Sequence, residues 1–173
     1  MHLPTLTTDR LKLRQRQQSD VEACFAMDRE PGTLDWIDWP EEAGSWDDEA
    51  AHRAFIRARI DGPYPEGLGY WVMEPRDGPA TFLGWILLIP IDAAGPEVEI
   101  GWRIPTAHRG RGYATEGGRA VLHHALKTLG LPQVVADIYP QNAASRSVAE
   151  KIGMTEIGPI PRAEGLLRYT IDA

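Results

Sequence analysis

The residues His108-Arg-Gly-Arg-Gly-Tyr-Ala-Thr-Glu116 form a glycine-rich turn between two regular stretches of the chain. Before the turn, Glu97 to Ile104 alternates apolar and polar residues, as a half-buried strand does. After it, Tyr113 to Leu129 places apolar residues at helical spacing and is closed by Gly130 and Pro132. Backbone N–H groups at a helix N-terminus hold phosphate well. The arrangement therefore predicts a site for a phosphorylated ligand.

Two features of the turn itself support this prediction. Gly110 and Gly112 let the backbone approach a ligand closely, and Arg109 and Arg111 add positive charge. A Walker phosphate loop needs Lys followed by Ser or Thr after the last glycine. The chain has Tyr113-Ala at that place, which excludes this class of nucleotide site.

A dinucleotide site fits the turn better than a Walker loop does, but still poorly. Asp137 lies downstream at the end of the next predicted strand, as such a site requires. However, Thr115 replaces the third glycine, and the preceding strand is half polar, whereas a Rossmann sheet starts with a buried parallel strand. A glycine-rich helix entry without any ligand remains the structural alternative.

The rest of the chain indicates a mixed α+β layout around one central sheet. The pattern predicts these elements: a helix from the capping-box spacing of Ser19 and Glu22, an irregular loop over 30–46, a helix led by Asp47, Asp48 and Glu49 that ends within 62–69, strands at Tyr70–Glu74, Phe82–Ile89, Val134–Tyr139, Thr155–Ile160 and Leu166–Ile171, and a last helix from Asn142 to Gly153.

Composition narrows the classes of protein. The chain has 173 residues, the size of one domain, and we expect a single domain over residues 1–173. Its net charge of −7 disfavours nucleic-acid binding, and no apolar run reaches the ~20 residues that cross a membrane. Cys24 is the single cysteine, which fits the cytoplasm. His123 and His124 are adjacent and cannot both face one metal, so we predict no metal site.

Four ordered blocks of the chain resemble one known family. They are Glu97-Val-Glu-Ile-Gly-Trp-Arg-Ile104, the turn 108–116, Asp137-Ile-Tyr-Pro-Gln-Asn-Ala-Ala-Ser145, and Val148-Ala-Glu-Lys-Ile-Gly-Met154. Together they are similar to the GNAT superfamily of N-acetyltransferases. Thr7-Thr-Asp-Arg-Leu-Lys-Leu-Arg14 is also similar to the first strand of the RimJ/RimL branch, which acetylates α-amino groups of ribosomal proteins. The resemblance implies a mixed, mostly antiparallel sheet of about seven strands, splayed between the fourth and fifth and flanked by helices.

The resemblance also implies a binding site for acetyl-coenzyme A. The family pattern Arg/Gln-x-x-Gly-x-Gly/Ala matches Arg109, Gly112 and Ala114. Backbone amides would then bind the pyrophosphate of the coenzyme, and the strand before the turn would pair with its pantetheine arm. The implied binding residues are Ile100, Trp102, Ile104, Arg109, Gly110, Arg111, Gly112, Tyr113, Ala114, Thr115 and Asn142. Asn142 is equally an ordinary helix N-cap.

Glu99 is the leading candidate for the general base, acting through a water, because it stands on the polar face of that strand. Glu97 shares this face and either assists or is solvated. The family's general-acid tyrosine is replaced by Ala149, and the resemblance makes Ser145 the substitute. Glu164 matches a glutamate of the branch only loosely. Two more residues, Arg146 and Lys151, either approach the 3′-phosphate of the coenzyme or are solvated.

The variable segment 30–65 is expected to recognise the acceptor. Its acidic residues alternate with Trp36, Trp39 and Trp46, which indicates either a mouth for a cationic amine or a loop anchored by packing. The implied function is transfer of an acetyl group from acetyl-CoA to a primary amine, such as the N-terminus of a ribosomal protein. The alternatives are an aminoglycoside or polyamine acetyltransferase and a non-catalytic coenzyme A module. A homodimer is compatible with each.

Overall fold

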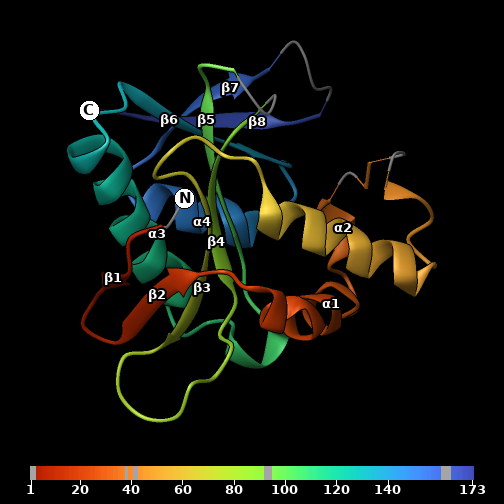
Figure 1. Cartoon of the computed structure of the whole chain (residues 1–173). Helices are drawn as coiled ribbons and strands as arrows, with labels where there is room; N and C mark the ends of the chain where they lie inside the picture. The colour runs from red at the N-terminus through yellow and green to blue at the C-terminus, as the bar shows by residue number, and fades with distance from the viewer. Residues whose placement is uncertain (1–2, 38, 41–42, 92–94, 161–164) are drawn as a thin grey trace.

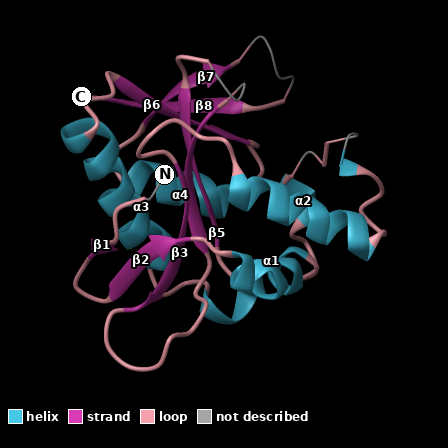
Figure 2. Cartoon of the chain, in the orientation of Figure 1, coloured by secondary structure: helices cyan, strands magenta, loops and turns pink. Residues whose placement is uncertain are grey.

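The computed structural model describes residues 3–37, 39–40, 43–91, 95–160 and 165–173, and within them one eight-stranded sheet runs in the order β1-β2-β3-β4-β5-β6-β8-β7. All neighbouring strands pair antiparallel except β5 and β6, which are parallel. Helices cover both faces of the sheet (Figures 1 and 2). The strands are β1 (Leu6–Thr7), β2 (Leu11–Gln15), β3 (Gly69–Pro75), β4 (Trp85–Pro90), β5 (Val98–Arg103), β6 (Gln133–Ile138), β7 (Thr155–Pro159) and β8 (Leu167–Asp172); the α-helices are α1 (Val21–Asp28), α2 (Glu49–Asp61), α3 (Tyr113–His123) and α4 (Ala143–Lys151).

The predicted fold class is confirmed, with one more strand than expected. The predicted first strand is divided into β1 and β2 by a turn, in which the N–H of Thr8 donates to the Leu11 carbonyl at 2.9 Å. The expected splay lies between β5 and β6. These two strands share a single register position, Glu99 with Val135, whereas β4 pairs with β5 along all of Val98–Arg103.

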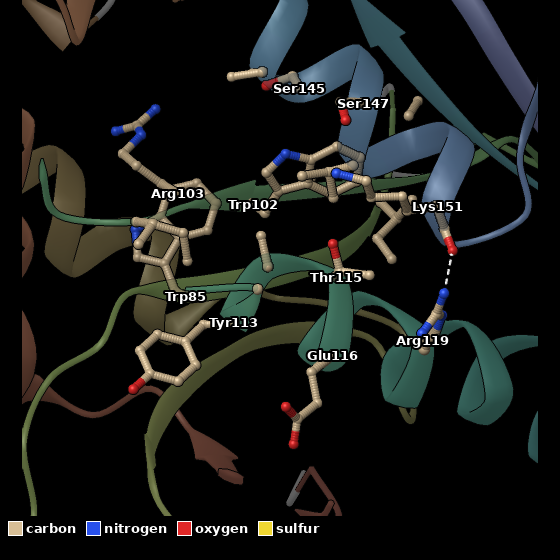
Figure 3. Close-up of a pocket in the computed structure, with 18 of the residues that line it drawn as sticks. Trp85, Trp102, Arg103, Tyr113, Thr115, Glu116, Arg119, Ser145, Ser147 and Lys151 are labelled. Atoms are coloured by element: carbon tan, nitrogen blue, oxygen red, sulfur yellow. Dashed lines mark hydrogen bonds between the residues drawn. The ribbon is translucent and has the colours of Figure 1, made fainter. Parts of the chain in front are cut away.

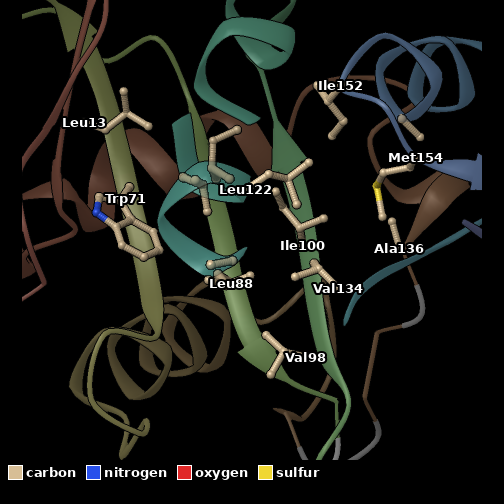
Figure 4. Packing of buried hydrophobic residues seen from close by; sticks show 14 of the residues in the cluster. Leu13, Trp71, Leu88, Val98, Ile100, Leu122, Val134, Ala136, Ile152 and Met154 are labelled. Atoms are coloured by element: carbon tan, nitrogen blue, oxygen red, sulfur yellow. The ribbon is translucent and has the colours of Figure 1, made fainter. Parts of the chain in front are cut away.

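The main core lies between the sheet and the helices α3 and α4 (Figure 4). It is built from the apolar residues that alternate along the strands and recur along the helices, including Leu13, Trp71, Leu88, Ile100, Leu122, Val134, Ala136, Ile152 and Met154. Gly117 lets α3 lie close to the sheet, because a Cβ there would be 2.7 Å from the Met73 sulfur. The position of α3, and therefore of the turn before it, is fixed by this packing.

A second, smaller core lies under α1 and α2 on the opposite face. It contains Val21, Cys24, Phe25, Met27, Ile56, Tyr70, Trp85 and Ile89. Strands β3 and β4 are consequently buried on both faces, which explains why their residues read as nearly continuous apolar runs.

The predicted capping box at the start of the first helix is wrong. A 3₁₀ turn over Gln18–Asp20 precedes α1, and no capping box joins Ser19 to Glu22. The carboxylate of Asp20 instead accepts the N–H of Gln17 at 2.7 Å, and Glu22 binds Arg53 of α2 at 2.9 Å. A capping box two residues earlier, between Gln17 and Asp20, and the long-range pair with Arg53 therefore take the place of the predicted cap.

The helix after the turn is α-helical over Tyr113–His123, a shorter span than the predicted Tyr113 to Leu129. It continues as a π-helical turn over His124–Thr128. His124 is buried there, with its ring Nε2 3.0 Å from the carbonyl oxygen of Gly67. At the start of α2, Glu49 lies in the first turn as predicted, whereas Asp48 is the N-cap, since its side chain accepts from the N–H groups of Ala50 and Ala51. Across the described ranges, every helix is too short or too polar to traverse a bilayer.

Candidate active site

A cavity of about 1810 Å³ opens where β5 and β6 diverge. Both strands line it beyond their single register position, Ile100 to Arg103 from β5 and Ala136 to Ile138 from β6. The turn before α3 and the start of α4 complete its walls (Figure 3). The splay in the sheet is therefore what creates the cavity.

The cavity has two ends with different linings. The turn end is formed by Arg109, Gly110, Gly112, Tyr113 and Thr115. The tryptophan end is formed by Trp36, Ile37, Trp85, Arg103 and Tyr139. The sequence-predicted residues that line the cavity are Glu99, Ile100, Trp102, Ile104, Arg109, Gly110, Gly112, Tyr113, Ala114, Thr115, Asn142 and Ser145.

Arg111 is the one predicted binding residue that does not line the cavity. It is exposed, and its carbonyl accepts a hydrogen bond from Arg10 Nη1 at 3.1 Å. Arg111 therefore contacts the N-terminal strand pair through its backbone, and its predicted part in coenzyme binding stays a prediction.

The backbone of the turn depends on its glycines. Gly112 is the N-cap of α3 with φ 80° and ψ 8°, and Gly110 has φ 73°. Both values lie in the left-handed region that side chains other than glycine rarely adopt. The Arg109 side chain folds back, so that its Nε donates to the Ile104 carbonyl at 3.0 Å. This bond fixes the end of β5 against the turn.

A clamp from the N-terminal strand pair holds the first turn of α3. Glu116 accepts hydrogen bonds from Thr8 Oγ1 at 2.6 Å, from the N–H of Arg10 at 2.9 Å and from Arg10 Nε at 2.6 Å. Burial alone would raise the pKa of Glu116, but the hydrogen bonds from Thr8 and Arg10 outweigh it and lower this pKa. Arg10 also lies over the Tyr113 ring, 5.2 Å from its centroid. The clamp joins segments about a hundred residues apart, so no local sequence signal predicts it.

Two basic side chains lie on another wall of the cavity. Arg119 of α3 and Lys151 of α4 both line it, and Arg119 Nη2 donates to the Lys151 carbonyl at 2.6 Å (Figure 3). Lys151 is one of the two basic residues predicted to approach the 3′-phosphate, whereas Arg119 is not among them. Arg146, the other predicted candidate for the 3′-phosphate, does not line the cavity. Its Nε instead donates to the Tyr169 hydroxyl at 3.0 Å.

The start of α4 is ordered by Asn142. Its Oδ1 accepts the N–H of Ser145 at 3.0 Å, which confirms the N-cap interpretation. Ser145 is half-buried at the cavity wall, on the helix opposite Tyr113 and Thr115 (Figure 3). Ala149 is completely buried in the main core. A tyrosine at that position would have to displace core side chains.

Glu99 of β5 and Glu97, which directly precedes this strand, have different surroundings. Glu99 is half-buried and lines the cavity. Glu97 does not line it; its Oε1 accepts from Arg168 Nη1 at 2.6 Å. Arg168 is clamped further by both carboxylate oxygens of Asp137, each at 2.8 Å, and these hydrogen bonds raise its pKa. Glu97 thus belongs to an ion-pair network, and Glu164 lies outside the described residues.

A buried network supports the tryptophan end. Arg103 lies over the Trp85 ring, 4.8 Å from its centroid, and is paired with Asp28 of α1. The same carboxylate lies 3.1 Å from Nε2 of His52, a residue of α2 with no exposed surface. Two helices and a strand therefore position Arg103 at the cavity.

One of the three tryptophans of the variable segment lines the cavity, and the other two pack against His52. Trp36 lines the cavity and lies 6.3 Å from the Tyr139 ring. Trp39 and Trp46 instead surround His52, with ring centroids at 4.9 and 4.2 Å. Two of the acidic residues nearby also have structural partners: Asp48 caps α2, and Glu49 binds Arg53. Asp38, Glu41 and Glu42 lie outside the described residues.

Titratable side chains elsewhere give no sign of a metal centre. In the ranges that the structure describes, no group of three or more His, Cys, Asp or Glu residues is placed to hold a metal ion. His123 lines the cavity, whereas His124 points to Gly67, so the adjacent pair divides between two environments.

Comparison with known proteins agrees with this architecture. Residues 10–155 match the family model of the acetyltransferase (GNAT) domain. The chain is 37% identical to an uncharacterized N-acetyltransferase, YnaD, of Bacillus subtilis over 153 residues, covering 88% of this chain and 84% of that protein. It is 27% identical to the FsC-acetyl coenzyme A-N(2)-transacetylase of Aspergillus fumigatus, covering 97% of this chain and 76% of that protein.

Solved structures show the same fold. An acetyltransferase from Agrobacterium tumefaciens superposes with a TM-score of 0.73 at 30% identity, over 100% of this chain and 96% of the other. RimL in complex with coenzyme A superposes with a TM-score of 0.73 at 18% identity, over 99% and 98% of the two chains. Because the family model spans most of the sequence, the chain belongs to the GNAT acetyltransferase family and is an acetyl-CoA-dependent acyltransferase.

Proposed function

We propose that this protein transfers an acetyl group from acetyl-CoA to a primary amine, with a protein N-terminal α-amine as the preferred acceptor. One observation carries the proposal. Glu99, on β5, lines the same cavity as the turn whose N–H groups lead into α3, at the point where β5 leaves β6. A proton acceptor and an anion site then share a single cavity, as acyl transfer from a phosphorylated donor to an amine requires.

The lining fits acetyl-CoA in its chemistry. The turn supplies backbone N–H groups and the positive end of α3 for a pyrophosphate. Arg119 and Lys151 supply positive charge for a further phosphate. His108 lines the cavity with a buried Nδ1 that has no hydrogen-bond partner in the described structure, so a bound ligand would satisfy it. We assign the turn and these basic residues to the coenzyme.

Glu99 is assigned the role of general base. An amine attacks only after losing its proton, and an α-amino group with a pKa near ~8 is already partly neutral at pH 7, whereas a lysine near ~10.4 is not. A half-buried carboxylate acting through a water is sufficient to deprotonate an α-amino group. Glu99 lines the cavity and Glu97 does not, which makes Glu99 the better placed of the two.

Ser145 is assigned the return of a proton to the departing thiolate. Bound acetyl-CoA supplies the thioester carbon to which the amine nitrogen forms a bond while the carbon–sulfur bond breaks. Ser145 is held at the cavity wall through Asn142, and its hydroxyl is replenished from solvent. The N–H groups of β5 near Ile100 face the divergence of the strands, where they would polarise the acetyl carbonyl.

The acceptor assignment follows the RimJ/RimL type of enzyme. The fold likeness to RimL and to Mycobacterium smegmatis RimJ, with a TM-score of 0.73 for each, supports it. A small-molecule amine is the second candidate, because the Aspergillus fumigatus relative is named for N(2)-transacetylation. Action in the cytoplasm fits the single buried free cysteine, Cys24.

A screen of amines tests the function and the acceptor class together. The full chain is mixed with acetyl-CoA and one acceptor, and release of free thiol is followed. The panel contains peptides with free N-termini, the same peptides with blocked N-termini and one lysine, a polyamine and an aminoglycoside. Fastest turnover is expected with the free N-termini. Preference for the polyamine or aminoglycoside favours the second candidate, and coenzyme binding without thiol release for any amine would indicate a non-catalytic module.

A further inference from the structure

The tryptophan end of the active-site cavity carries one charged side chain. Of the five residues that form this end, Arg103 is the cation, and the others are Trp36, Ile37, Trp85 and Tyr139. Trp36 is one of two large hydrophobic side chains that are exposed in the described part of the chain. A charge beside aromatic and apolar walls is screened less than one in open water. This end of the cavity therefore suits an anionic group of a ligand.

Three contacts hold Arg103 at the cavity wall. Its backbone pairs with that of Trp85 across β4 and β5, and its guanidinium lies 4.8 Å from the centroid of the Trp85 ring (Figure 3). Its Nη1 donates to Oδ1 of Asp28, whose other oxygen lies 3.1 Å from Nε2 of His52. Because the side chain is held before any ligand arrives, binding to it costs little further conformational entropy.

One edge of the Arg103 guanidinium is not used by these contacts. Asp28 takes Nη1 alone, and Nε and Nη2 have no hydrogen-bond partner among the described residues. Neither of these nitrogens is a buried atom without a partner, and the side chain is 20% exposed, so both keep accessible surface. Two parallel N–H groups on this edge match the two oxygens of a carboxylate.

Arg103 shares one face of β5 with Glu99. Alternate residues of a strand lie on the same face, so Glu99, Gly101 and Arg103 follow one another along it, and all three line the cavity. Gly101, between the two charged residues, projects no side chain into the cavity. At about 3.3 Å per residue, the Cα atoms of Glu99 and Arg103 are about 13 Å apart. A single extended molecule can therefore contact both residues.

We propose that the acceptor is a peptide with an acidic residue at its second or third position, whose carboxylate accepts from Arg103 Nε and Nη2. The inference rests on the proposed function, in which the α-amine of the acceptor meets Glu99 through a water. Consecutive Cα atoms of a peptide are about 3.8 Å apart. An acidic side chain one or two residues after the N-terminus therefore reaches Arg103, whose own side chain covers part of the distance. A free amino acid falls short, because its carboxylate and its amine are on the same carbon.

Matched peptides test this inference on the full chain. Release of free thiol is followed at saturating acetyl-CoA for peptides that begin serine-glutamate, serine-alanine-glutamate or serine-glutamine and continue with the same neutral sequence. A charge-assisted hydrogen bond is lost when glutamine replaces glutamate. The better of the two glutamate peptides should therefore exceed the glutamine peptide in kcat/KM by at least about tenfold. The difference should lie mainly in KM, because Arg103 holds the acceptor and does not touch the reacting atoms.

Substitutions at position 103 separate this contact from a general effect of peptide charge. Arg103→Gln should lose the preference for glutamate, and Arg103→Lys, which keeps the charge without the paired N–H groups, should keep only part of it. Arg53→Gln is the matched control and should keep the parent's preference. Arg53 also lies over an aromatic ring, that of Phe25 at 3.8 Å, and pairs with Glu22, but it does not line the cavity. If Arg103→Gln does not fold because Asp28 is left unpaired, Arg103→Gln/Asp28→Asn removes both charges and gives the same decision.

Two results would overturn the inference and leave the proposed function intact. They are equal kcat/KM values of the parent for the glutamate and glutamine peptides, and a preference for glutamate that is as large in the Arg103 variants as in the parent. A third result, no thiol release with any peptide, would overturn the proposed acceptor class and this inference with it. The experiment therefore distinguishes failure of the Arg103 contact from failure of the proposed function.

Discussion

The turn end and the tryptophan end of the active-site cavity are built from the sequence in different ways. The turn end comes from one nearly continuous stretch, which runs from β5 through the turn into α3. The tryptophan end combines Trp36, Trp85, Arg103 and Tyr139, which are brought together only by folding. Consequently the turn end is recognisable from a motif, whereas no local pattern in the sequence predicts the tryptophan end, to which we assign the acceptor.

The largest effect is expected at the turn end, from Gly112→Asp. An aspartate there would need the left-handed φ of 80°, and its Cβ would lie 3.4 Å from Arg10 Nη2. It would also add a carboxylate at a site for anions. We expect acetyl-CoA affinity, measured by calorimetry, to fall by more than about a hundredfold, the loss of roughly 3 kcal/mol.

Gly78→Asp is the matched control for this substitution. Gly78 also has a positive φ, 101°, but it lies outside the cavity with nothing within 4 Å of an added Cβ. Its variant carries comparable backbone strain and the same new charge, and should bind acetyl-CoA as the parent does. Equal affinities in the parent and in Gly112→Asp would remove the turn from the coenzyme site.

The difference between the turn end and the tryptophan end also explains which features the sequence predicts and which it does not. The positions of β5, the turn and α3 follow from alternation, glycine spacing and helical periodicity, which are local properties. The Thr8–Arg10–Glu116 clamp and the Asp28–His52 pair join residues far apart in the chain, and neither leaves a periodic signal. For the same reason, the sequence leaves two surroundings open for Trp39 and Trp46, and their contact with His52 places them in the packing.

Glu99→Gln tests the chemistry that we assign to the cavity between its two ends. If Glu99 takes the proton of the amine, kcat should fall by about 10²- to 10⁴-fold while acetyl-CoA affinity stays nearly unchanged. The deficit should shrink as the pH approaches the amine's own pKa of ~8, since more substrate then arrives neutral. A lysine acceptor, near ~10.4, should remain dependent on Glu99 over a wider pH range.

The matched control for this variant is Glu97→Gln. Glu97 directly precedes β5, does not line the cavity and is bound to Arg168, so we expect a small change in stability and a kcat close to the parent's. A rate for Glu99→Gln equal to the parent's over roughly pH 6 to 9, around the amine pKa, would transfer the role to another group or to a water chain.

Asp28→Asn should affect the tryptophan end and leave the turn end intact. The substitution leaves Arg103, whose side chain is 20% exposed, without its buried counter-charge and removes the anionic partner of His52. Losing one member of a buried pair costs about 3 kcal/mol. We expect that loss in urea unfolding, together with a higher KM for the acceptor and an unchanged affinity for acetyl-CoA.

Asp77→Asn provides the comparison for an exposed pair. Asp77 binds Arg76 at 3.0 Å, and its side chain is 81% exposed, so removing its charge should change stability by less than about 1 kcal/mol. If Asp28→Asn were as stable as this variant and kept the parent's KM, the Asp28–His52 pair would have no part in positioning Arg103.

The smallest effect is expected from the clamp on the turn end. Arg10→Ala leaves the Glu116 carboxylate uncompensated in the first turn of α3, close to the site assigned to the pyrophosphate. Affinity for acetyl-CoA should fall about tenfold, the equivalent of 1.4 kcal/mol. In the double variant Arg10→Ala/Glu116→Gln most of the affinity for acetyl-CoA should return, because the unpaired charge of Glu116 is then removed as well. A double variant as weak as Arg10→Ala would mean that Arg10 acts through contact with Tyr113 or Arg111 instead of through charge.

The pH dependence of stability separates the ionic part of this clamp from its hydrogen bonds. Hydrogen bonds from Thr8 and Arg10 outweigh burial and lower the pKa of Glu116 in the folded protein, relative to about 4.3 when unfolded. The ionised carboxylate therefore stabilises the fold above the unfolded pKa, and this contribution is lost as the pH falls through the folded pKa. The parent should exceed Glu116→Gln in unfolding free energy by about 1 kcal/mol near neutral pH. Urea titrations should show this difference shrinking below about pH 4. A difference that stays constant down to pH 3 would show that the amide replaces the carboxylate's hydrogen bonds without any ionic contribution.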